Sequence, residues 1–221
     1  MRTMESRFRF LLACLSVLAA VSVVSAAETD AQKATASPDD ATVWYDCKDL
    51  VVEGKGWTDT QSFYDRLPAK AEGKVPPSVW GLSHHSAGMC VPFSSDARSI
   101  QVRWTLLEKG NLSMPHMPAT GVSGVDLYGK DTSGRWSFVA NGRPAGATNT
   151  ARFSPLVGQP CLLYLPLYNG VTSVEIGVPK GSTLSGADPA ASKQRKPIVI
   201  YGTSITHGGC ASRPGLAFPA I

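Results

Sequence analysis

Ser204 stands where a serine nucleophile would be expected, directly after a turn that ends a buried-strand pattern. Residues 198–201 form an unbroken apolar run, which is typical of a central parallel strand covered on both faces. Gly202 permits a sharp turn, and Ser204 then opens a helix or loop at the carboxyl end of that strand. Unpaired N–H groups at such a turn, including that of Ser204, stabilise the oxyanion of an acyl-transfer intermediate. On spacing alone, however, a serine that only caps the turn is the simpler interpretation.

Other motifs fit this turn less well. Residues 202–206 (Gly-Thr-Ser-Ile-Thr) lack the second glycine of the G-x-S-x-G elbow, which disfavours an ordinary α/β-hydrolase. No Gly-Lys-Ser/Thr sequence follows, so a phosphate-binding loop is excluded.

The four histidines do not supply an evident base or metal site. His207 is three residues after Ser204 and could touch it on a helical turn, but no neighbouring carboxylate would orient it. His84 and His85 are adjacent, so on a strand they would point to opposite faces, and a packed polar site is favoured over a metal. His116 lies between prolines in a loop, which favours ordinary packing. We therefore expect no metal site; the absence of an organic cofactor is an expectation that depends on the family resemblance described below.

The elements before Ser204 follow a two-residue period. Strict alternation of apolar and polar residues in 100–106, repeated in 89–93, 163–167 and 174–178, predicts strands with one buried face. Turn signals separate them, and Asp131 to Gly134 predicts a hairpin. Many short strands with frequent turns predict a mainly β chain, an antiparallel sandwich of jelly-roll type. The predicted core contains Val102, Trp104, Leu127, Phe138, Leu165 and Ile176.

Composition divides the chain into five segments. We predict a signal peptide over 1–26, a flexible lead-in over 27–43, a sandwich domain over 44–180, a linker over 181–196 and the first strand of a second domain over 197–221. Within the sandwich domain, residues 59–67 could form one or two helical turns ended by Pro68. The basic run at 193–196 is interpreted as a solvated part of the linker.

The first 26 residues indicate export. A basic start precedes 17 apolar residues, and Val24 and Ala26 suit the −3 and −1 positions of a signal-peptidase site. Retention as a membrane anchor is the alternative, but the run is short for a span. A lipoprotein box ending at Cys14 is a minor alternative. We expect a periplasmic or secreted protein with no stable membrane insertion after cleavage.

Charge and cysteine content limit the partners and the redox chemistry. The formal net charge is +4, and Arg2, Arg7 and Arg9 against Glu5 place half of it in the leader. So small a charge does not indicate a nucleic-acid partner. Four cysteines remain after the leader: Cys47, Cys90, Cys161 and Cys210. The sequence allows two interpretations, either two disulfide bonds or partly buried free thiols.

Two stretches resemble one enzyme family. Residues 197–209 (PIVIYGTSITHGG) resemble block I of the SGNH, or GDSL-like, hydrolases, with Thr203 where aspartate is common. Residues 124–128 (Gly-Val-Asp-Leu-Tyr) match the G-x-D-L-Y signature of the N-terminal domain in one branch of that family. The resemblance implies that Ser204 is the nucleophile, with its own backbone N–H in the oxyanion hole. It also implies supporting roles in the motif for Gly202, Thr203, Gly208 and Gly209.

The resemblance further implies an exported serine esterase that hydrolyses a small-molecule or carbohydrate ester through an acyl-enzyme. In that family, further oxyanion donors and an Asp-x-x-His base follow later in the sequence, whereas this chain ends 17 residues after Ser204. We therefore expect a fragment that is inactive alone. The alternative is a non-catalytic carbohydrate-binding module, in which Trp57, Trp80 and Tyr168 stack on sugar.

Overall fold

The computed structural model describes residues 41–190, 196 and 198–221. The predicted signal peptide and residues 27–40 of the predicted lead-in lie outside the described residues. The first strand begins at Thr42, so the lead-in prediction is wrong for residues 42 and 43. None of the helices in these described ranges is long and apolar enough to cross a membrane.

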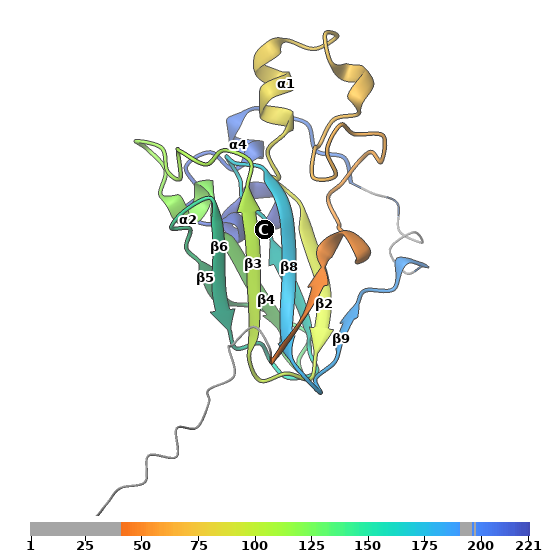
Figure 1. Ribbon diagram of the computed structural model, residues 1–221. Coiled ribbons are helices and arrows are strands. Elements are labelled where there is room, and N and C mark those ends of the chain that lie inside the picture. Colours follow the sequence, from red (N-terminus) through yellow and green to blue (C-terminus); the bar gives the residue numbers. More distant parts are fainter. Residues whose placement is uncertain (1–40, 191–195, 197) are drawn as a thin grey trace, which may run out of the picture. The chain divides into compact units, whose positions relative to one another are not determined.

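Two antiparallel sheets form the sandwich, as predicted (Figure 1). The four-stranded sheet has the order β1 (Thr42–Asp46), β8 (Val171–Pro179), β3 (Ile100–Leu106), β6 (Thr148–Phe153). The five-stranded sheet has the order β5 (Trp136–Gly142), β4 (Val125–Lys130), β7 (Pro160–Tyr164), β2 (Cys90–Ser95), β9 (Leu184–Gly186). Short helices complete the described chain: η1 (Cys47–Asp49), η2 (Ala69–Ala71), α1 (Pro77–Ser83), α2 (Ala119–Val122), α4 (Ser204–His207), η3 (Pro214–Leu216) and η4 (Phe218–Ala220).

The core lies between the two sheets and follows the predicted alternation. Along β3 the side chains of residues 100, 102, 104 and 106 are buried, and the residues between them are half-buried. The indole N–H of Trp104 donates to the Ser123 carbonyl oxygen at 3.0 Å, so this large core residue leaves no unpaired donor. Five of the six predicted core residues are confirmed as buried: Val102, Trp104, Leu127, Leu165 and Ile176.

Phe138 was predicted in the core but is 45% exposed. The register between β4 and β5 shifts after Leu127, where Leu127 pairs with Ala140 and Tyr128 pairs with Phe138. One extra residue on β5 thus interrupts the alternation, and a shift of one residue exchanges the two faces of a strand. The predicted hairpin between these strands is confirmed, with Gly134 at a φ of +85°.

Two local predictions are wrong. Residues 59–67 form turns and bends instead of helix, and the first helical residues after Pro68 belong to η2. The predicted linker contains β9, whose residues 184–186 pair with β2. Short polar segments of this kind become strands because an existing edge offers unpaired N–H and C=O groups. The four cysteines among the described residues are free thiols, with only Cys210 exposed.

The predicted strand at 198–201 is also absent. Within the described ranges no strand pairs with it, and the side chains of Ile198, Val199 and Tyr201 are 84–90% exposed. A strand without a neighbour leaves its backbone groups unpaired, so an apolar sequence alone does not produce one. The residues after it do pack on the sandwich: Ala217 contributes to a second small core with Met117, Val122 and Leu167.

Candidate active site

Ser204 is exposed and is the first residue of α4, a single helical turn. The turn needs a glycine before it, because a Cβ on Gly202 would lie 2.2 Å from the Thr206 hydroxyl oxygen. It also needs Gly208 after it, which has a φ of +98° and lies against Leu167. The N–H of Gly209 then donates to the Ser204 carbonyl oxygen at 2.7 Å. The motif glycines thus define the backbone around the serine.

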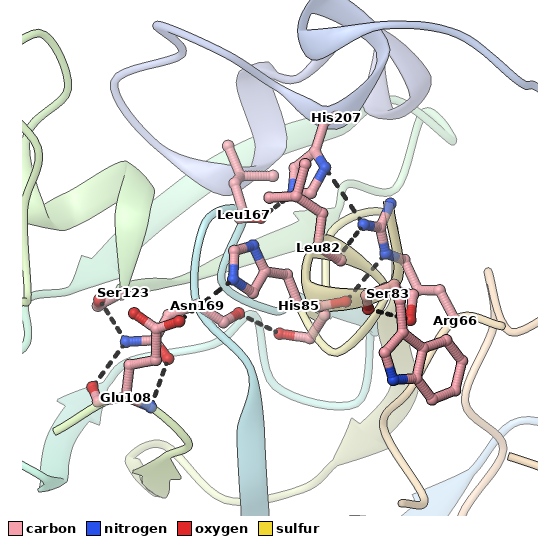
Figure 2. A network of polar contacts seen from close by, with 11 residues as sticks. Arg66, Leu82, Ser83, His85, Glu108, Ser123, Leu167, Asn169 and His207 are labelled. Carbon is pink, nitrogen blue, oxygen red and sulfur yellow. Dashed lines mark hydrogen bonds and ion pairs between the residues drawn. The ribbon is translucent and has the colours of Figure 1, made fainter. Parts of the chain in front are cut away.

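His207 attaches α4 to the sandwich and does not serve Ser204. Its Nε2 lies 2.6 Å from the Leu167 carbonyl oxygen, so Nε2 carries the proton and donates. Its Nδ1 lies 3.2 Å from a guanidinium nitrogen of Arg66 and accepts from it (Figure 2). Burial, and secondarily the charge of Arg66, lowers the pKa of His207 to about 3. The ring is therefore neutral with both nitrogens engaged, which excludes it as the base for Ser204 in this arrangement.

Tyr168 lies against α4, the turn that carries Ser204, from the sandwich side. Its ring packs on His207 with centroids 4.3 Å apart, and its hydroxyl donates to the Ser204 carbonyl oxygen at 3.4 Å. Tyr168 is half-buried, as is Trp80, which packs edge-on against His84. Of the three aromatic residues predicted to stack on sugar, only Trp57 is exposed, with 45% of its surface accessible.

A network of buried polar groups supports this region (Figure 2). Asn169 is fully buried; its amide oxygen accepts from the backbone N–H of Glu108, and its amide nitrogen donates to the Glu108 carbonyl oxygen. The Glu108 carboxylate faces His85 Nε2 at 3.7 Å. Arg66 donates through Nε to the His85 carbonyl oxygen at 2.9 Å. This series of contacts from Asn169 to Arg66 connects a loop of the sandwich with α4, because Arg66 also bonds to His207.

A second attachment is made by the aspartate of the G-x-D-L-Y signature. Asp126 is fully buried in β4, and its Oδ2 accepts from Arg213 Nη1 at 3.0 Å and from the backbone N–H of Gly215 at 2.9 Å. Its Oδ1 accepts from Asn141 at 2.7 Å. Tyr128, also from the signature, donates its hydroxyl to the Gly215 carbonyl oxygen at 3.2 Å. The signature therefore holds the loop that begins a few residues after Ser204.

The remaining histidines form no metal centre in the part of the chain that the structure describes, where no cluster of three or more His, Cys, Asp or Glu side chains could hold an ion. His84 pairs through Nδ1 with buried Asp65 at 3.0 Å. His116 is exposed.

Two sequence families match the chain. The family described as the N-terminus of SGNH hydrolase-type esterases, named GxDLY, matches residues 42–184. The chain belongs to the SGNH (GDSL-like) hydrolase family, in the branch with this N-terminal domain. The GDSL-like lipase/acylhydrolase family matches residues 195–221, the segment that carries Ser204.

One solved structure supports this family assignment. A protein from Bacteroides ovatus ATCC 8483, described as a GDSL-like lipase, is 33% identical with a TM-score of 0.72 over 81% of this chain and 52% of that one. This SGNH-family chain thus spans about half the length of that relative. Salicylyl-acyltransferase SsfX3 from a tetracycline biosynthetic pathway is 17% identical with a TM-score of 0.44, over 66% of this chain and 41% of that one. No curated protein matches the chain.

Sequence reasoning located the turn that carries Ser204 but missed the residues that attach it to the sandwich. Ser204, Gly202, Thr203, Gly208 and Gly209 lie together, as their spacing requires. The missed residues are those that attach the turn to the sandwich: Arg66, His85, Glu108, Asp126, Asn169 and Arg213. The sequence did not mark Asp126 as buried, because it lies between Val125 and Leu127 at the polar position of an alternating strand, which is expected to face solvent.

Proposed function

We propose that the protein is an exported SGNH-type serine esterase whose nucleophile is Ser204. The observation that carries the proposal is an exposed serine opening α4, a helix that is bonded to the sandwich through His207 and, after it, through Arg213. In the proposed reaction the Ser204 hydroxyl oxygen attacks the ester carbonyl, and the backbone N–H of Ser204 donates to the resulting oxyanion. The alcohol leaves, and water then hydrolyses the acyl-enzyme.

The base is proposed to come from outside the described residues, because the ring nitrogens of His207 are both engaged. By the same argument residues 41–221 alone would show no esterase activity, since a serine hydroxyl without a positioned base is a weak nucleophile. Export is proposed from the leader-like sequence of residues 1–26. The proposed substrate class is an acyl ester of a small alcohol or carbohydrate, hydrolysed without a metal or organic cofactor.

The test is hydrolysis of p-nitrophenyl acetate by the full-length protein, meaning the product of the whole gene with any sequence outside these 221 residues, and by its Ser204→Ala variant. Loss of a nucleophile typically lowers turnover by several orders of magnitude while leaving the fold intact. Ser185→Ala, which changes an exposed serine on edge strand β9, is the matched control and should keep wild-type turnover. Wild-type turnover by Ser204→Ala would refute the assignment.

A second candidate is a carbohydrate-binding module without catalysis, favoured by the sandwich fold and by exposed Trp57. It predicts that glycan binding, measured by calorimetry, survives Ser204→Ala and is lost in Trp57→Ala. Because Trp80 and Tyr168 are half-buried in packing contacts, this candidate has fewer aromatic residues available than the sequence suggested.

A further inference from the structure

A hollow of about 370 Å³ lies on the sandwich beside the segment that carries Ser204. Its polar lining is His85, Glu108, Asn111, Ser113 and Tyr168. Tyr168 connects the hollow to the nucleophile turn, because its hydroxyl also contacts the Ser204 carbonyl oxygen. A molecule with its reactive group at Ser204 would therefore have this hollow as its neighbouring surface.

Glu108 gives the hollow a fixed acceptor. Its side chain is 54% exposed, while its backbone N–H and carbonyl oxygen are both bonded to the buried amide of Asn169. The amide is itself held, since it also donates to the Ser123 hydroxyl at 3.1 Å. A carboxylate on a backbone fixed in this way is a supported group, which is characteristic of binding sites built on rigid elements.

His85 adds a second polar group to the same wall. Its side chain is 9% exposed, its Nε2 faces the Glu108 carboxylate (Figure 2), and its buried Nδ1 has no hydrogen-bond partner among the described residues. Burial lowers the pKa of His85, and the nearby Arg66 and His84 act in the same direction against the opposing effect of Glu108. A neutral imidazole protonated at Nε2 directs that N–H toward the Glu108 carboxylate, while the buried Nδ1 is not accessible to a ligand.

The lining favours neutral hydroxyl groups over anions. Among the described residues that line the hollow none is Lys or Arg, and the one formal charge is the carboxylate of Glu108. A phosphate or carboxylate on the ligand would be repelled by that charge, whereas sugar or polyol hydroxyls would donate to it. Met114 and other apolar side chains supply the surface against which the carbon skeleton of such a ligand packs.

We infer that this hollow binds the polyhydroxylated alcohol part of the ester, with Glu108 accepting hydrogen bonds from its hydroxyls. The inference rests on the proposed function and gives the same site its substrate class. In this arrangement the acyl group lies at Ser204, and the alcohol extends past Tyr168 toward Glu108.

The experiment uses two acetate esters that differ only in the alcohol: a mono-acetylated methyl glucoside and cyclohexyl acetate, which has a six-membered ring without hydroxyls. The ratio of kcat/KM for the sugar ester to that for cyclohexyl acetate is measured in the full-length protein. Glu108→Gln should lower this ratio about tenfold, mainly through KM for the sugar ester, because a hydrogen bond to a charged group is lost. Ser113→Trp, which fills the hollow, should lower it as well.

Glu72→Gln changes an exposed carboxylate that bonds to Gln61 and does not line the hollow, so it should keep the wild-type ratio. Circular dichroism establishes that each variant is folded. Ser204-dependent hydrolysis of both esters with an unchanged ratio in Glu108→Gln would overturn the inference and leave the proposed function standing. A wild-type enzyme with no preference for the sugar ester would also overturn it, and hydrolysis of neither ester would overturn both.

Discussion

Replacement of Arg213 by methionine should destabilise the protein by about 3 kcal/mol. Asp126 is fully buried and would keep two donors, the Gly215 N–H and the Asn141 amide, but would lose its only cationic partner among the described residues. Removing one member of a buried ion pair costs about 3–5 kcal/mol. The lower end applies because the Arg213 side chain is 21% exposed and two donors remain. Arg213 also lies over the Phe138 ring at 3.8 Å, and that contact is lost as well.

Urea unfolding followed by circular dichroism measures the free-energy change. Arg135→Met is the control, since Arg135 pairs with Asp131 at the surface and its side chain is 80% exposed; this variant should cost at most about 1 kcal/mol. The double variant Asp126→Asn with Arg213→Met should be more stable than Arg213→Met alone, because it leaves no uncompensated buried charge. Equal costs for Arg213→Met and Arg135→Met, or no recovery in the double variant, would refute the reasoning.

Two further predictions concern protonation and thiol access. The pKa of His207 is lowered to about 3, below the ordinary 6.5, so its stabilising effect is complete above pH 6.5 and falls as the pH drops toward 3. Through His207, acidification from pH 6.5 to 5 should cost about 2 kcal/mol. The loss measured by urea unfolding should therefore be smaller by about that amount in His207→Gln, where His85, whose pKa is also lowered by burial, still contributes. Among the described cysteines, Cys210 is exposed and should react first with iodoacetamide. Burial raises the pKa of the Cys90 and Cys161 thiols to about 12 and 11, so mass spectrometry should find both, together with buried Cys47, labelled only after unfolding.

The sandwich could be predicted from the sequence because each of its strands has one buried face. Burial of one face produces a two-residue period of apolar and polar residues, which is visible in the sequence. The burial of Phe138 was predicted wrongly because an extra residue on β5 exchanges the two faces of the strand at that point. No pattern within the strand shows which residue is the extra one. The strand predicted at 198–201 is absent for a different reason. Apolar composition reports that a segment could be buried, but a strand also requires a neighbour, which the sequence of that segment does not contain.

The site was predictable only in its local part. Gly202, Ser204 and Gly208 lie within seven residues, so turn geometry constrains them together. The attachments of that turn join residues far apart in the chain: Arg66 with His207 are separated by 141 positions, and Asp126 with Arg213 by 87. Such pairs follow from the packing of the C-terminal segment on the sandwich, which no periodicity encodes.

These attachments bear on how Ser204 is held. Residues 198–201 are exposed and unpaired in the described structure, yet α4 is bonded to the sandwich through His207 and the loop after it through Arg213 and Gly215. The contacts that hold Ser204 therefore lie on its C-terminal side and end on residues of the sandwich. Two of those residues, Asp126 and Tyr128, belong to the G-x-D-L-Y signature. The signature of the N-terminal domain is thus, in physical terms, part of the surface that holds the segment carrying Ser204.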